Sequence, residues 1–319
     1  ALAYGKAYVE ANFTADQIDE NGDGAVDNVC FVVSGEVAAW SNLLWPHMTS
    51  MVMNTTWQGK TIKAYNFQLA QYLFTQQQGS GVLVHEFMHT LGFPDMYRAR
   101  GSLHPVGLWS VMANHGTWPQ YPTVYEREQY GCWEPQIVEI EKDGTYTLQK
   151  STATQGVLAY RIPHPKRVNE YFMVEYRKRG GNWENTFSAD GLLVYRINEA
   201  ARDGLNGNLN GPPDELFVFR KGADTQEQDG LLYYPTAMDA ESYGTSQQSE
   251  SYVADSVHFS DGQGSGIEFS DIKVEGDSLT FTVTGVPQWR SMKGSGSKFD
   301  PYQITNEWEL QLVRRDMDA

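Results

Sequence analysis

The chain has 319 residues, of which 40% are hydrophobic and 13% aromatic, a composition that suits a globular protein with a sizeable core and more than one domain. Its 40 acidic residues outnumber the 24 Lys and Arg residues, and the net charge of -16 disfavours nucleic acid as a partner. No apolar run approaches the roughly 20 residues that span a bilayer, and the first residues lack signal-peptide features, which predicts a processed or trimmed segment.

An acidic turn, DENGDGAVD, is the first motif along the chain. It places oxygen donors at alternate positions, as the first part of an EF-hand calcium loop does: Asp19, Asn21, Asp23, the carbonyl of Ala25, and Asp27. The twelfth position, where an EF-hand carries a bidentate glutamate, is Cys30, so a complete EF-hand is excluded. The turn therefore predicts a truncated, structural calcium site. The alternative is a plain turn of Asp, Gly and Asn before a strand.

Two elements are predicted after this turn. Residues 27–37 contain a short apolar, β-branched run, which predicts a buried strand. Residues 66–92 have a helical pattern that is broken at 79–81. The second part is predicted to be a helix that carries two histidines and stops at Gly92, with Pro94 beyond.

The segment HEFMH on this second helix has the pattern of a metal site. His85 and His89 lie one turn apart on the same helix face, so both imidazoles can reach one ion. A catalytic zinc needs three protein ligands and an open position for a water molecule. Glu86 projects beside the same face, where it can reach that water. The helix thus supplies two zinc ligands and a candidate base, and a third ligand is required.

The third ligand is predicted to follow the helix. Gly92 permits a sharp turn, because glycine takes positive φ without a Cβ clash, and Asp95 can then fold back onto the ion. The pattern His-Glu-x-x-His-x-x-Gly-x-x followed by a ligand is the metzincin arrangement, with aspartate in place of the usual histidine. His104 and His115 are rival third ligands.

The segment GLWSVMANHGTW, downstream of Asp95, carries Met112 as a candidate for the methionine turn that lies beneath the metal in metzincins. The alternative is that Met112 is an ordinary core residue. The tyrosine that assists catalysis in some metzincins would fall at Asn114, so such assistance is not evident. Asn114, His115 and Tyr125 are substitutes among which the sequence does not choose.

These parts together predict a zinc endopeptidase. Zinc lowers the pKa of its water to around 7 and polarises the scissile carbonyl. Glu86 takes the water proton and passes it to the leaving amine. One alternative is a non-catalytic surface adhesin or glycan-binding protein that retains a peptidase-like fold, against which the intact base argues. A second alternative is another metal hydrolase, such as a deacetylase.

Residues 141–286 contain short β-branched and aromatic segments separated by Gly, Asp, Asn and Pro, a pattern typical of an antiparallel β-sandwich. The strand-like segments are GTYTLQ, GVLAYRI, EYFMVEYRKR, GLLVYRINE, ELFVFRKG and DSLTFTVTG. Residues 201–214, rich in Gly, Asn and Pro, predict a long exposed loop. Core packing is favoured over carbohydrate binding for four aromatic residues of this region: Trp183, Tyr195, Tyr233 and Tyr234.

The tail and the two cysteines give weaker signals. Residues 287–319 begin with a Gly/Ser linker and end in an amphipathic helix, which predicts the start of a further module; a C-terminal docking helix is the alternative. Cys30 and Cys132 are too few for a disulfide-stapled scaffold. Two buried unpaired thiols are favoured over a single disulfide.

The chain resembles the immune inhibitor A family of secreted bacterial metallopeptidases, a metzincin branch, over residues 10–285. The segments that carry the resemblance are HEFMHTLGFPDMY, GLWSVMANHG, YGCW, DENGDGAVDNVCFVVSG and EYFMVEYRKRGGNWENTFSADGLLVYRINE. The resemblance implies that His85, His89 and Asp95 hold zinc and that Glu86 is the catalytic base. The family's catalytic domain normally begins with further strands that are missing here, and the tail looks like the opening of repeat modules of bacterial surface proteins.

The sequence therefore predicts an α+β protein with three parts. Residues 1–140 form a metzincin-like zinc peptidase catalytic domain that is truncated at its N-terminus, and residues 141–286 form the β-sandwich. Residues 287–319 are the linker and the start of a further module. We expect an extracellular or cell-surface monomer that acts on proteins or peptides, with catalytic zinc and structural calcium.

Overall fold

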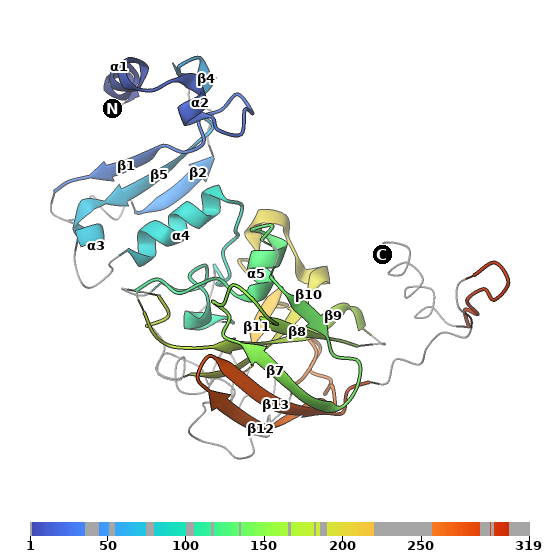
Figure 1. Cartoon of the computed structure of the whole chain (residues 1–319). Coiled ribbons are helices and arrows are strands. Elements are labelled where there is room, and N and C mark those ends of the chain that lie inside the picture. Colours follow the sequence, from blue (N-terminus) through green and yellow to red (C-terminus); the bar gives the residue numbers. More distant parts are fainter. Residues whose placement is uncertain are drawn as a thin grey trace. The chain divides into compact units, whose positions relative to one another are not determined.

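The computed structural model shows an α+β protein with few helices and several sheets (Figure 1). The residues that it describes are 2–35, 45–50, 55–74, 80–99, 105–115, 118–133, 135–164, 167–181, 183–185, 190–219, 257–287, 294 and 297–305. Two compact units are present: Ala1–Phe93 with His115–Gln120, and Pro94–Asn114 with Tyr121–Ala319. The predicted boundaries at 140 and 286 stay predictions.

The first unit is built around a three-stranded sheet of order β1-β5-β2, in which β5 pairs parallel with β1 and antiparallel with β2. Helix α4 packs on β2 and β5 (Figure 1). The bounds of the elements are α1 Leu2–Asn12, α2 Ala15–Ile18, β1 Cys30–Val33, β2 His47–Ser50, β3 Thr56–Trp57, β4 Lys60–Thr61, β5 Ala64–Leu69, α3 Ala70–Phe74 and α4 Gly81–Thr90.

Two predictions for this unit are wrong in part. The strand predicted in 27–37 is present as β1, but it is not buried, and its Val32 is 52% exposed. The reason is that β1 is an edge strand of the sheet among the described residues. Residues 66–69 were predicted to be helical but belong to β5, because pairing with strands on both sides overrides local helix propensity.

The second unit contains a five-stranded sheet of order β11-β10-β9-β8-β6 and a three-stranded sheet of order β12-β13-β7. Neighbouring strands are antiparallel, except that β6 pairs parallel with β8. The bounds of the elements are η2 Gly107–Trp109, α5 Val124–Gln129, β6 Ile137–Glu139, β7 Gly144–Gln149, β8 Ala159–His164, β9 Arg167–Arg177, β10 Gly191–Asn198, η3 Glu199–Ala201, η4 Gly204–Asn206, β11 Leu216–Val218, β12 Glu268–Glu275 and β13 Ser278–Thr284.

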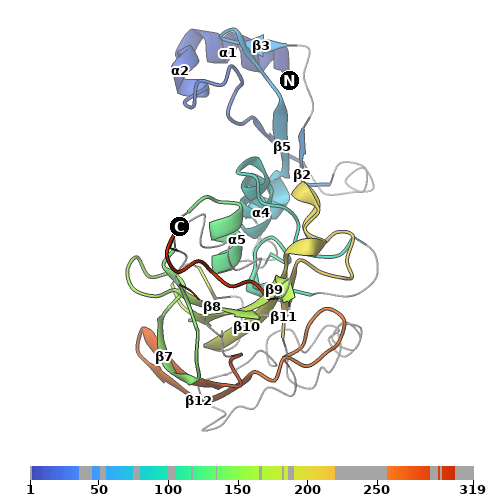
Figure 2. The same cartoon turned by 90° about the vertical axis from the view of Figure 1, so that its right-hand side faces the viewer.

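The two sheets of this unit lie next to each other (Figure 2), and they share one hydrophobic core. Phe172 and Leu192 from the larger sheet, and Leu148 and Phe281 from the smaller sheet, are completely buried in it. Alternation of apolar and polar residues along β13 gives this strand its buried face. The six strand-like segments of the sequence each overlap one of the observed strands, whereas β6 and β12 were not predicted.

The predictions for the aromatic residues and for the loop of this unit have different outcomes. Tyr195 is completely buried, as core packing predicts, whereas Trp183 is 39% exposed; Tyr233 and Tyr234 lie outside the described residues. The long exposed loop predicted over 201–214 is wrong for its middle, since Asn208 is only 1% exposed. Gly207 and Asn208 make close buried contacts, described below, where the composition suggested solvent.

The remaining sequence predictions concern the two cysteines and the C-terminal tail. Cys30 and Cys132 are both free, as favoured, but both are exposed and not buried. Cys30 is exposed because it lies on edge strand β1, and Cys132 lies in the turn after α5. The helix predicted at the end of the tail lies outside the described residues.

No helix within the described ranges has the length and apolar character needed to cross a bilayer.

Candidate metal centre

Helix α4 presents two histidines on one face. It ends at Thr90, where the N–H groups of Leu91 and Gly92 bond to the carbonyls of Met88 and His89 at 2.9 and 3.0 Å. Gly92, the predicted stop, follows two residues after the helix end and has φ of +94°, which glycine tolerates. The rings of His85 and His89 have their centroids 4.8 Å apart. The spacing of four residues therefore brings both imidazoles together.

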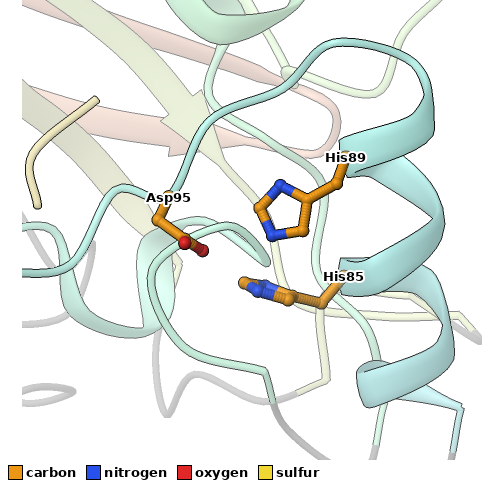
Figure 3. A group of neighbouring side chains, drawn as sticks. All are labelled: His85, His89 and Asp95. Carbon is orange, nitrogen blue, oxygen red and sulfur yellow. The ribbon is translucent and has the colours of Figure 1, made fainter. Parts of the chain in front are cut away.

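Asp95 completes a group of three metal-ligand side chains with these histidines (Figure 3). One ligand atom from each of His85, His89 and Asp95 lies within 4.8 Å of the others, and the carboxylate of Asp95 points toward the two rings. His89 Nδ1 lies 2.7 Å from the carbonyl of Phe93. If Nδ1 carries the proton, as this acceptor requires, Nε2 keeps its lone pair for a metal. Two imidazoles and one carboxylate form a donor set that suits zinc.

Glu86 lies beside this group and is held by the sheet. It is 8% exposed, and its Oε2 accepts the backbone N–H of Met48, on β2, at 2.7 Å. A hydrogen bond from a fixed backbone group limits the rotation of the carboxylate. The first unit therefore gives Glu86 a defined orientation next to the two histidines.

The segment that carries Asp95 is joined to the turn at Met112. The N–H of Met96 donates to the carbonyl of Met112 at 2.8 Å, and Met112 is completely buried. The turn is tight, because the backbone N–H of Met112 bonds to Ser110 Oγ at 3.1 Å. The role of Met112 beneath a metal remains a prediction. Its turn is nevertheless a fixed neighbour of the Asp95 segment.

Sequence reasoning missed Glu126, the residue that holds this turn. Ser110 Oγ donates to Glu126 Oε1 at 2.7 Å, and Glu126 is completely buried. Burial raises the pKa of Glu126 to about 7, although the Ser110 and Thr123 donors act in the opposite direction. The signal was present in the sequence, because Thr123 and Glu126 form a capping box at the start of α5.

The residues that the sequence offered as alternative third ligands, or as substitutes for an assisting tyrosine, differ in their surroundings. The ring of His115 lies 5.6 Å from that of His85, and burial, followed by the charge of His85, lowers the pKa of His115 to about 4. His115 is not part of the three-ligand group, and His104 lies outside the described residues. Tyr125 is 1% exposed and donates its hydroxyl to Glu215, so this hydroxyl has a structural partner. Asn114 donates its backbone N–H to the Ser110 carbonyl.

The acidic turn is closed by its own backbone and by a lysine. Asp19 Oδ2 accepts the N–H of Gly24 at 3.0 Å and the ammonium of Lys60 at 2.5 Å. The bond from Lys60 lowers the pKa of Asp19. The other predicted donors also accept backbone N–H groups: Asn21 from Asp23, Asp23 from Ala25, and Asp27 from Glu20. In the described part of the chain, His85, His89 and Asp95 form the only group of three His, Cys, Asp or Glu side chains whose ligand atoms lie close enough together to hold one metal ion.

Comparisons with known proteins point to a metallopeptidase. Residues 17–144 match the family model described as immune inhibitor A peptidase M6, catalytic domain. The pre-pro-metalloprotease PrtV of Vibrio cholerae serotype O1, in strains M66-2 and ATCC 39315 / El Tor Inaba N16961, is 27% identical over 152 residues. This similarity covers 41% of the present chain and 16% of the relative, so the chain spans a small part of the relative's length. No solved structure matches significantly. Over residues 17–144 the chain is therefore similar to the catalytic domain of the immune inhibitor A family of metallopeptidases.

Proposed function

We propose that the chain carries a zinc-dependent endopeptidase site that hydrolyses peptide bonds of proteins, with Glu86 as the general base. The observation that carries this proposal is the convergence of His85, His89 and Asp95, whose ligand atoms lie within 4.8 Å of one another. The match of residues 17–144 to a metallopeptidase family model supports the same reaction class. A glycan-binding protein would need neither this ligand group nor a carboxylate beside it.

Each residue has a distinct role in the proposal. His85 and His89 hold the metal through imidazole nitrogens, and Asp95 holds it through a carboxylate oxygen. When bound, zinc supplies an acidified water and an electrophile for the scissile carbonyl. Glu86 accepts a proton from the attacking water and delivers it to the leaving amine nitrogen. The N–H of Met48, 2.7 Å from Glu86 Oε2, orients that carboxylate.

The test combines metal analysis with cleavage of casein. The wild-type chain should contain one zinc per molecule and should lose cleavage in a chelator. Glu86→Gln should keep the zinc, because the ligands are unchanged, and should lose cleavage by at least about 100-fold. Glu10→Gln, at an exposed glutamate paired with Lys6, is the matched control and should cleave normally. Cleavage that persists in Glu86→Gln would overturn the role of Glu86.

Three further proposals concern the rest of the protein. The acidic turn is proposed as a structural calcium site, supported by Asp19 Oδ1, a buried oxygen with no hydrogen-bond partner among the described residues. The two sheets that share a core are proposed to be the β-sandwich that follows a metzincin-like domain. Secretion and protein substrates are proposed from the resemblance to secreted bacterial metallopeptidases, and the monomeric state stays a prediction.

A further inference from the structure

The segment between β10 and β11, residues 199–215, makes buried contacts with the segment that carries Asp95. It is drawn in yellow in Figure 2. It contains the short helices η3 and η4, and it then runs through Gly207 and Asn208, which are both buried. A buried polar residue such as Asn208 requires hydrogen-bond partners, and these partners reveal what the segment does.

Asn208 uses every hydrogen-bonding group of its side chain. Its Nδ2 donates to the carbonyl of Met96 at 3.2 Å and to that of Leu216 at 2.7 Å. Its Oδ1 accepts the N–H of Glu215 at 2.8 Å and that of Leu216 at 3.2 Å. An amide offers two donors and two acceptor sites, so the side chain is fully satisfied. Asn208 thus ties the backbone at Met96 to the start of β11.

The backbone of Asn208 contacts the candidate ligand residue itself. Its N–H donates to the carbonyl oxygen of Asp95 at 2.9 Å. Gly207 makes this approach possible, because a Cβ there would lie 2.3 Å from the Asp95 oxygen and 3.0 Å from Pro94 Cβ. Gly207 also has φ of +49°, in the region that favours glycine. Position 207 therefore requires glycine for two independent reasons.

The contact continues beyond Asp95 along both segments. The N–H of Ala99 donates to the carbonyl of Leu209 at 3.0 Å. Arg98 Nε donates to Asp214 Oδ1 at 2.8 Å, and both side chains are at most 2% exposed. Buried, charge-assisted bonds of this kind fix geometry more strongly than neutral surface bonds. The Asp95 segment is thus held along its length by residues more than 100 positions later in the chain.

We infer that Gly207 and Asn208, together called the Asp95 clamp, are positioning residues for the third metal ligand. The clamp fixes the backbone that directly follows the Asp95 side chain, at the carbonyl of Asp95 and at that of Met96. A ligand whose backbone is already ordered loses less conformational freedom when a metal binds, which increases metal affinity. This inference rests on the proposed zinc site, and it adds residues that lie outside the segment matching the peptidase family.

Amide hydrogen exchange of the unmodified chain tests the coupling without a mutation. If the clamp holds the ligand, zinc must in turn stabilise the clamp, because the coupling between two sites is reciprocal. The Asn208 amide should exchange several-fold more slowly with zinc than after chelation. The Asn206 amide, which bonds to Asp203 in the same segment at 2.8 Å, is the internal control and should not change. Equal exchange of Asn208 with and without zinc would overturn the inference.

Substitutions provide a second test, in which zinc affinity is measured by competition with a chelator. Gly207→Ala and Asn208→Ala should each weaken zinc binding by about 10- to 100-fold, as is typical for residues that orient a ligand. Asn210→Ala is the matched control, because Asn210 is exposed in the same segment and its side chain bonds to Asp203. The visible spectrum of the cobalt-substituted protein should change in the clamp variants and stay unchanged in the control.

The unfolding temperature of each metal-free variant separates loss of the ligand position from loss of the fold. Variants that fold and bind zinc as tightly as the wild type would overturn the role of the clamp, while leaving the proposed function intact. A wild-type chain that binds no zinc would overturn the proposed function and this inference with it. If the clamp variants do not fold, the exchange experiment on the unmodified chain decides the question.

Discussion

Arg177 donates a hydrogen bond to the backbone carbonyl of Trp109 at 2.7 Å, although the two residues lie far apart in the sequence. The same guanidinium binds the carboxylates of Glu175 and Glu184 at 3.0 and 2.6 Å, and Arg177 is 1% exposed. A further bond reaches the carbonyl of Tyr121 at 3.2 Å. A buried ion cluster on β9 therefore fixes the chain on both sides of the methionine turn.

Removal of this buried cation should destabilise the protein strongly. Arg177→Met leaves two buried carboxylates without their partner, which costs about 3–5 kcal/mol of unfolding free energy. Arg167→Met removes an arginine whose pair with Asp261 is exposed, and should cost at most about 1 kcal/mol. Urea unfolding in the presence of a chelator measures both values. Equal losses for the two variants would contradict a structural role for the Arg177 cluster.

Glu126 should make stability depend on pH. Burial raises its pKa from 4.5 to about 7 in the folded protein, so the folded state binds the proton more tightly than the unfolded state. Its contribution is fully present below about pH 4.5 and is lost as the pH rises through about 7. At about 1.4 kcal/mol per pKa unit, the change amounts to about 3 kcal/mol.

The comparison with Glu126→Gln isolates this effect. Gln does not titrate, so the unfolding free energy of the wild type minus that of the variant should fall between pH 5 and pH 8. Measurements in a chelator remove the contribution of metal binding. A difference that is constant over this range would show that Glu126 keeps one protonation state throughout.

Lys60 should compete with calcium at the acidic turn. Its ammonium bonds to Asp19 Oδ2 at 2.5 Å, where it supplies the positive charge that a cation would supply. Lys60→Met should therefore enlarge the rise in melting temperature caused by millimolar calcium. Lys150→Met is the control, because Lys150 pairs with Asp277, which is not one of the proposed calcium donors. Absence of any calcium response in the wild type and in Lys60→Met would remove calcium from the proposal.

Metal removal should lower the melting temperature of the wild type. Zinc at 1,000 times its dissociation constant stabilises a folded protein by about 4 kcal/mol. Asp95→Ala removes one of the three proposed ligands, so most of this zinc-dependent increment should disappear. Thermal unfolding with and without a chelator gives the increment for each protein. An undiminished increment in Asp95→Ala would exclude this aspartate as a ligand.

The features that could be predicted from sequence are local ones. The spacing of His85 and His89 and the stop at Gly92 depend on helix geometry over one or two turns, and the structure agrees with them. Residues 66–69 could not be assigned in this way, because their strand depends on pairing with β1 and β2. The acidic turn had a clear pattern, but the pattern did not reveal that Lys60 lies against it.

Asn208 illustrates why the remainder of the site was hidden. A segment rich in Gly, Asn and Pro has the composition of a solvent-exposed loop. The same residue types are needed where one backbone approaches another closely and where a buried amide satisfies several backbone groups. Composition does not distinguish these two uses. The position of Asp95 in space was required to identify the second one.

The bond between Asn208 and Asp95 also limits how this protein can be rearranged by recombination. The segment that matches the peptidase family ends at residue 144, whereas Gly207 and Asn208 lie beyond it. A gene fragment cut at that point would encode the three proposed metal ligands without the backbone support of Asp95. Chimeras that exchange residues 17–144 between relatives would therefore need a compatible glycine and asparagine inherited from the same parent.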